Sequence, residues 1–293
     1  MKYSVAGNVT RLSSEIDSVL YDDLLPHTYS VKFSMDTGFY LEKIEDMKIP
    51  SRIYGDATET ALRIISTFER RPEQTGVHLT GEKGSGKTLL SKVLSKMLRA
   101  RGVPTIIVNS PFSGEQFNTF VANITTPTMF VFDEYEKMYG EADQETMLTL
   151  FDGTRNSKKL FVITTNDDAR VGKYLKNRPG RFYYSLRYKG LDANFVSQYV
   201  EENLNDKSKV ANTIRFCNVF ENNLNFDMLQ ALIAEMNMYN EDAKDAVKLL
   251  NIEPVFSRST YDVIKVNVNE HADDDYGKNV EVTLPKTVVA NPY

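Results

Sequence analysis

Residues 81–88 read GEKGSGKT and match the pattern GxxxxGK[ST] at every fixed position. This pattern is typical of a loop that holds the phosphates of a nucleotide, because its glycines let several backbone N–H groups point at one anion. Lys87 is expected to reach the β- and γ-phosphates, and the Thr88 hydroxyl is expected to bind Mg²⁺. The predicted nucleotide-binding residues here are Gly81, Glu82, Lys83, Gly84, Ser85, Gly86, Lys87, Thr88 and Leu89.

The residues around this loop supply the context that the pattern needs. Val77–Thr80 is a short apolar run, typical of a buried strand. After the loop, apolar residues recur at helical spacing, and the start of that helix adds partial positive charge near the phosphates. The alternative is a glycine-rich turn that matches by chance, which would not require a strand before it and a helix after it.

Two adjacent carboxylates follow a second apolar run. Met129–Phe132 is expected to form a strand, and Asp133 and Glu134 come directly after it. In nucleotide hydrolysis one such carboxylate meets Mg²⁺, directly or through its waters, and the next can polarise the attacking water. We therefore assign the metal role to Asp133 and the general-base role to Glu134. An acidic strand end exposed to solvent is the alternative.

Polar residues at two further places could complete this chemistry. Asn166 follows the apolar run 160–164, where its amide could bind the γ-phosphate and the attacking water. Arg178 and Arg181 flank a Pro-Gly turn, and arginine suits the stabilisation of charge on a transferring phosphoryl group. The alternatives are an asparagine that serves the turn and two arginines that are solvated or paired locally.

The pattern of elements that must position these residues is that of an α/β domain. Short apolar runs alternate with helical stretches, and the expected strands are 77–80, 105–108, 129–132, 160–164 and 182–186. We divide the chain into a lead-in with a β-hairpin at 1–48, an α/β core at 49–190, a helical segment at 191–255 and a β-rich tail at 256–293. Within the lead-in, 29–33 and 39–44 flank the expected hairpin turn.

Composition limits the classes of protein that this chain can be. Its 293 residues carry a net charge of −5, which disfavours a general basic coat for nucleic acid but leaves room for a local basic pore. No apolar stretch is long enough for a spanning helix, so no membrane association is expected. Cys217 is the single cysteine, which fits a reducing cytoplasm.

The motifs taken together resemble the AAA clade proper of the AAA+ ATPases. The resemblance is carried by the loop at 81–88, Asp133-Glu134, and three further strings in register, LTLFDG (148–153), VITTN (162–166) and NRPGRF (177–182). It implies a P-loop NTPase fold with a five-stranded, mostly parallel sheet, a small helical lid and a ring, usually of six subunits. ATP and Mg²⁺ would be the cofactors.

The same resemblance implies roles for individual residues. Asn166 would be the sensor that reports which nucleotide is bound, and Arg178 and Arg181 would act in trans on a neighbouring subunit's ATP. Ile53-Tyr54-Gly55 sits where this clade packs a segment on the adenine. Phe112, in the loop after the second core strand, resembles the aromatic that grips a translocating chain; it could equally pack in the core or in a subunit interface.

The leading hypothesis is a ring-forming ATPase that remodels or disassembles a protein client. Two other classes remain open. One is a nucleic-acid motor or loader, which would need basic or aromatic residues facing the pore. The other is a scaffold that uses ATP only for assembly, and Glu134 argues against it because a binding-only module does not need a base.

Overall fold

The computed structural model describes residues 2–13, 20–152, 158–167, 171–172, 175, 178–220, 224–252, 260–262 and 287–289. Residues 1–252 form one compact unit and 253–293 a second. In the second unit, β11 (Thr260–Asp262) pairs antiparallel with β12 (Thr287–Val289). The rest of the β-rich tail expected at 256–293 lies outside the described residues.

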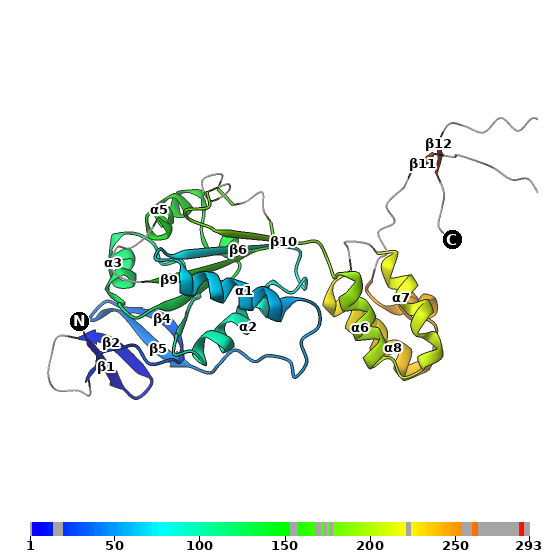
Figure 1. Cartoon of the computed structure of the whole chain (residues 1–293), viewed down its shortest axis with the longest axis horizontal. Coiled ribbons are helices and arrows are strands. Elements are labelled where there is room, and N and C mark those ends of the chain that lie inside the picture. Colours follow the sequence, from blue (N-terminus) through cyan, green and yellow to red (C-terminus); the bar gives the residue numbers. More distant parts are fainter. Residues whose placement is uncertain are drawn as a thin grey trace, which may run out of the picture. The chain divides into compact units, whose positions relative to one another are not determined.

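One ten-stranded sheet runs through the first unit (Figure 1). Its order is β10-β6-β9-β8-β7-β4-β5-β2-β1-β3. Its first half is parallel and made of the strands β10 (Tyr184–Tyr188), β6 (Thr75–Gly81), β9 (Lys159–Thr165), β8 (Thr128–Phe132) and β7 (Thr105–Val108). All five expected core strands are therefore confirmed within a few residues, in an α/β fold of the P-loop NTPase type.

β6, β9, β8 and β7 are almost wholly buried because helices cover both faces of this part of the sheet, whereas β10 at its edge alternates between half-buried and exposed residues. Met129 and Val131 of β8 contribute to the core under α1 (Ala57–Arg70) and α2 (Lys87–Arg99). Phe130 and Phe132 of the same strand contribute to the opposite core, with α3 (Glu115–Asn123) and α5 (Glu141–Phe151). Figure 1 shows the two helix pairs on the two faces of the sheet.

The lead-in extends this sheet instead of forming a separate part. The hairpin of β4 (Thr28–Ser34) and β5 (Gly38–Ile44) lies beside β7, with β4 parallel to it. β1 (Lys2–Ala6), β2 (Val9–Ser13) and β3 (Leu20–Tyr21) continue the sheet antiparallel. The five-stranded sheet expected from the sequence is thus half of a larger one. Pairing with β4 satisfies the backbone groups that β7 would otherwise leave open at an edge.

Four helices follow β10 and pack around a core of their own. They are α6 (Ala193–Asn203), α7 (Val210–Asn218), α8 (Phe226–Tyr239) and α9 (Ala243–Ala246), with short 3₁₀ turns at Lys207–Lys209 and Val247–Leu249. Val200, Leu229 and Leu232 are among the buried residues of this core. Among the described helices, none is long and apolar enough to cross a membrane.

Lys159 is a buried cation at the start of β9. Its side chain is fully buried, and Nζ donates hydrogen bonds to the carbonyl oxygens of Ile124 and Thr126. Burial lowers the pKa of Lys159 to about 7, from an ordinary value of 10.5. Between these two pH values the unfolded chain holds more protons at this site than the folded chain, so folding becomes more favourable as the pH rises.

The first prediction concerns this lysine. We expect the wild-type free energy of unfolding to gain a contribution between pH 7 and pH 9 that Lys159→Met lacks. Urea denaturation at pH 7, 8 and 9 measures the difference. Lys158→Met is the matched control, since the neighbouring side chain is partly exposed, and it should keep the wild-type slope. Equal slopes for wild type and Lys159→Met would contradict the assignment.

Candidate nucleotide-binding site

The loop at 81–88 leaves β6 and enters α2 with the backbone that the pattern predicts. Gly81 has a φ of 141°, and a Cβ there would lie 2.1 Å from the carbonyl oxygen of Tyr188. Gly84 has a φ of 78° and accepts a 3.1 Å hydrogen bond from the N–H of Phe226. Both positions therefore favour glycine, the first by close approach and the second by backbone conformation. Helix α2 begins at Lys87, so its N-terminus faces the loop.

Lys87 is folded back along this loop. Its Nζ donates 2.6 Å hydrogen bonds to the carbonyl oxygens of Gly81 and Glu82. Burial lowers the pKa of Lys87, and the nearby carboxylates of Asp133, Glu136 and Glu134 oppose that shift. The Lys87 ammonium is thus held by two backbone carbonyl oxygens and lies close to acidic groups. From this position it could turn to bind an incoming phosphate.

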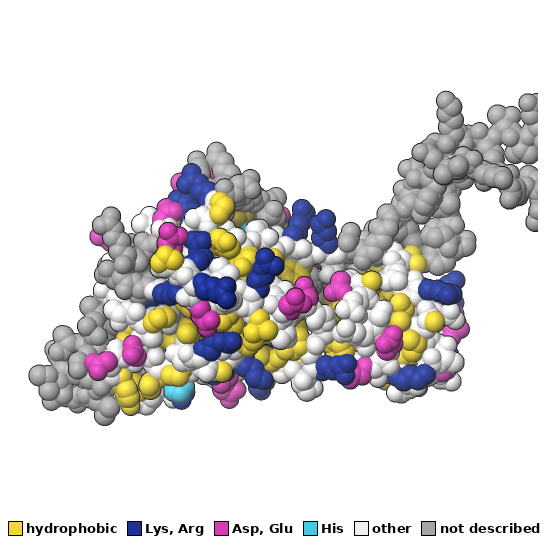
Figure 2. All heavy atoms as spheres, viewed as in Figure 1, with side chains coloured by type: hydrophobic (Ala, Val, Ile, Leu, Met, Phe, Trp, Pro, Cys, Tyr) yellow, Lys and Arg dark blue, Asp and Glu magenta, His cyan; other side chains and the backbone are white. Residues whose placement is uncertain are grey.

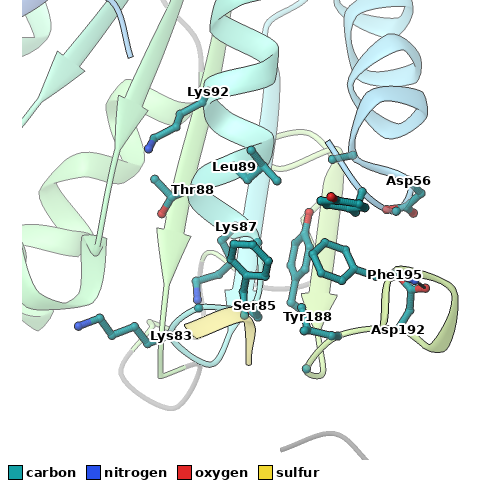
Figure 3. Close-up of a pocket in the computed structure, with 18 of the residues that line it drawn as sticks. Asp56, Lys83, Ser85, Lys87, Thr88, Leu89, Lys92, Tyr188, Asp192 and Phe195 are labelled. Atoms are coloured by element: carbon teal, nitrogen blue, oxygen red, sulfur yellow. Dashed lines mark hydrogen bonds between the residues drawn. The ribbon is translucent and has the colours of Figure 1, made fainter. Parts of the chain in front are cut away.

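A cavity of about 1160 Å³ opens between this loop and the helices after β10. Lys83–Leu89 line one part, and Figure 3 shows Lys83, Lys87 and Thr88 on one side with the rings of Tyr188 and Phe195 on the other. The volume exceeds the roughly 300–1,000 Å³ of ordinary ligand pockets, so the cavity can hold a whole nucleotide. Phosphate-binding and ring-stacking groups thus face one space.

The ends of β8 and β9 bring the predicted polar residues into the same cavity. Asp133, Glu134 and Asn166 all line it. Nδ2 of Asn166 donates a 3.1 Å hydrogen bond to Oε1 of Glu134, and the Asn166 N–H donates to Oε1 of Glu136 at 3.0 Å. The structure therefore brings together the residues predicted to hold a metal, activate water and sense the nucleotide.

Glu134 has a second donor that the sequence reading did not single out. Nζ of Lys137 lies 2.6 Å from the same Oε1 atom, and this contact, more than the one from Asn166, holds the pKa of Glu134 below its ordinary value. Glu134 is therefore ionised at neutral pH, as a base must be. Lys137 lies three residues further along in the short helix α4 (Tyr135–Met138).

The two arginines lie elsewhere and differ from each other. Arg178 is exposed, whereas Arg181 is buried, and its Nε and Nη2 donate to the two carboxylate oxygens of Asp152 at the end of α5. That contact lowers the pKa of Asp152. Neither arginine lines the cavity. Within a single chain, Arg181 is therefore paired locally, which was the alternative stated for it from the sequence.

The segment 53–55 and Phe112, the two predictions that involve aromatic residues, lie in different parts of the structure. Tyr54 and Gly55 line the cavity, while Ile53 packs with the core under α1 and α2. Phe112 is half-buried after β7, with its ring centroid 5.1 Å from that of Phe39 and 6.0 Å from that of Phe117. These contacts agree with packing of Phe112 in the core of its own chain, one of the alternatives stated from the sequence.

Other rings in the cavity carry no sequence pattern that would have singled them out. The Tyr54 ring packs against Phe195 and Tyr199 of α6, with centroids 5.6 and 5.2 Å apart, and Phe226 of α8 packs against the same two rings. The Tyr54 hydroxyl donates to Glu202 at 2.7 Å and accepts from Asn203 at 3.0 Å. Tyr54, α6 and Phe226 are far apart in the sequence, and only tertiary packing brings them together.

Fold and site together define a nucleotide-binding P-loop protein. A family model described as "ATPase family associated with various cellular activities (AAA)" matches residues 77–188, from β6 to the end of β10. Residues 77–188 therefore form an AAA domain, of the kind found in AAA+ ATPases. No curated protein matches the chain.

Solved structures with similar architecture include three variants of RuvB from Thermotoga maritima. They share 12 or 13% sequence identity, cover 69% of this chain and 71 or 72% of theirs, and give TM-scores of 0.48 or 0.49. Values this low carry no conclusion about activity or partners.

The second prediction tests the arginine that is paired within the chain. Asp152→Asn removes the charge that Arg181 binds, and we expect the free energy of unfolding to fall by ~1 kcal/mol, discounted because half of the Asp152 side chain is exposed. Nucleotide affinity should stay unchanged, since the pair lies outside the cavity. Asp245→Asn, which breaks an exposed pair with Lys248, is the control and should have no measurable effect.

Proposed function

We propose that this chain is a Mg²⁺-dependent ATPase that assembles into a ring, usually of six subunits, and couples ATP hydrolysis at subunit interfaces to the remodelling of a protein client. The observation that carries the proposal is the convergence of the phosphate loop, Asp133, Glu134 and Asn166 on one cavity. Glu134 would act as the base and Asn166 would orient it. The helices after β10 would serve as the lid.

The residues present fit ATP and Mg²⁺. The N-terminus of α2 and the loop N–H groups suit phosphates, and the Thr88 hydroxyl and Asp133 carboxylate are the oxygen donors that Mg²⁺ prefers. The rings of Tyr54 and Phe195 offer an apolar place for a base. When bound, Mg²⁺ would neutralise charge on the phosphates. The chain's own residues would bind and orient the nucleotide, and Glu134 would take up the proton.

The direction of the strands supports a site that is shared between copies. Arg181 lies against Gly76 near the start of β6, because a Cβ on Gly76 would come within 2.0 Å of the Arg181 carbonyl oxygen. The phosphate loop begins at Gly81, five strand residues or roughly 17 Å further along. Arg178 precedes Arg181 on that far edge and is exposed. We propose that Arg178 acts on a neighbouring copy and that Arg181, tied to Asp152, holds the turn.

Charge near the loop after β7 favours a protein client over nucleic acid. Ser113 of this loop donates to Asp143, and Glu115 and Glu141 lie at the starts of the helices that flank it. Carboxylates repel a phosphate backbone. On the face drawn in Figure 2, basic and acidic side chains lie interspersed. Proteins are therefore the class of client that we favour.

The third prediction tests hydrolysis and assembly together. ATPase rate is measured against protein concentration for wild type, Glu134→Gln and Arg178→Ala, with particle mass determined in ATP. We expect the specific activity of wild type to rise as rings form. Both variants should bind ATP normally yet turn over at least ~100-fold more slowly.

The control is Arg101→Ala, which removes an exposed arginine whose nearest carboxylate is 3.4 Å away on Glu69. It should behave like wild type. A monomer that hydrolyses ATP as fast as any assembly, with Arg178 dispensable, would overturn the shared site. Equal and negligible rates for wild type and Glu134→Gln would favour a scaffold that only binds ATP.

A further inference from the structure

The hydroxyl of Thr164 on β9 contacts both residues that follow β8. Its Oγ1 donates a hydrogen bond to Oδ1 of Asp133 and accepts one of 2.9 Å from the backbone N–H of Glu134. A hydroxyl has one proton to donate and two lone pairs that can accept, so the Thr164 hydroxyl is the donor in one contact and the acceptor in the other. One side chain thus joins the expected metal ligand to the backbone of the expected base.

The backbone of Glu134 depends on such a contact. Its φ of 50° and ψ of 47° place it in the left-handed region, one of two non-glycine residues with positive φ among the described residues. A non-glycine residue in this region is strained and stays there only when its surroundings fix it. The hydrogen bond from its N–H to Thr164 is one such restraint. With this backbone, the Glu134 side chain reaches Asn166 and Lys137.

The Thr164 side chain is itself buried. Thr164 is 1% exposed, and it lines the cavity beside Asp133. Strand pairing sets its position, since the register places Phe132, the last residue of β8, opposite Ile163. Loss of the hydroxyl would leave the half-buried Glu134 N–H, and one oxygen of the exposed Asp133 carboxylate, without this partner.

We propose that Thr164 is a positioning residue that sets the Asp133 carboxylate and the Glu134 turn together, and so aligns the metal ligand with the base. The proposal rests on the proposed ATPase function. Thr164 acts through the residues that it holds, and its contribution is geometric: misplacement of about 1 Å at such a site is costly even when every reacting group is present.

The fourth prediction compares Thr164→Val, which replaces the hydroxyl with a methyl of similar shape, with Thr164→Ser, which keeps it. We expect Thr164→Val to lower kcat by ~10- to 100-fold, the range usual for groups that orient ligands. Thr164→Ser should restore most of the loss. A fluorescent ATP analogue, titrated with and without Mg²⁺, gives a readout besides turnover: Thr164→Val should weaken only the Mg²⁺-dependent part of the affinity.

Thr165→Val is the matched control. Thr165 is the next residue of the same strand and equally buried, but its Oγ1 lies 2.9 Å from Nε2 of His78. This variant should keep kcat and the Mg²⁺ dependence. Unchanged kcat in Thr164→Val, an equal loss in Thr165→Val, or no rescue by Thr164→Ser would each overturn the proposal. If wild type shows no turnover at all, the ATPase proposal fails, while the Mg²⁺-dependent binding still tests Thr164.

Discussion

The parallel direction of β6, β9 and β8 is the constraint on which the site depends. Parallel neighbours end at the same edge of a sheet, so the phosphate loop, Asp133 and Asn166 meet although they are far apart in the sequence. The register between β8 and β9 then decides which side chains touch. Because side chains alternate between faces, a slip by one residue would turn Thr164 away from Asp133.

Because the strands are parallel, Arg178 and Arg181 lie at the edge of the sheet opposite the phosphate loop of the same chain. The turn that carries Arg178 lies before β10, at the edge opposite the loop that follows β6. This separation within a single copy is the physical reason for proposing that Arg178 acts on a neighbouring copy. Within the chain, Arg181 bonds to Asp152 and fixes this turn to the end of α5.

The N-terminal strands change the surroundings of the loop after β7. In the structure Phe39 of the added hairpin packs on Phe112, so that ring belongs to a cluster that also includes Phe117. The turn between 29–33 and 39–44 was enough to predict a hairpin, but not where it would pair. Pairing partners of an edge strand depend on which backbone groups the rest of the fold leaves open, and no local pattern records that.

Local sequence determined the five core strands, the phosphate loop and the acidic strand end, because each rests on chemistry within a few residues: glycine conformations, short apolar runs and adjacent carboxylates. Tertiary structure alone decided that Asn166 meets Glu134, that Thr164 joins Asp133 to Glu134, and that Tyr199 of α6 packs against both Tyr54 and Phe226 of α8. Those contacts join different turns or elements, and their partners are set by strand register and helix packing, which spacing along the chain does not encode.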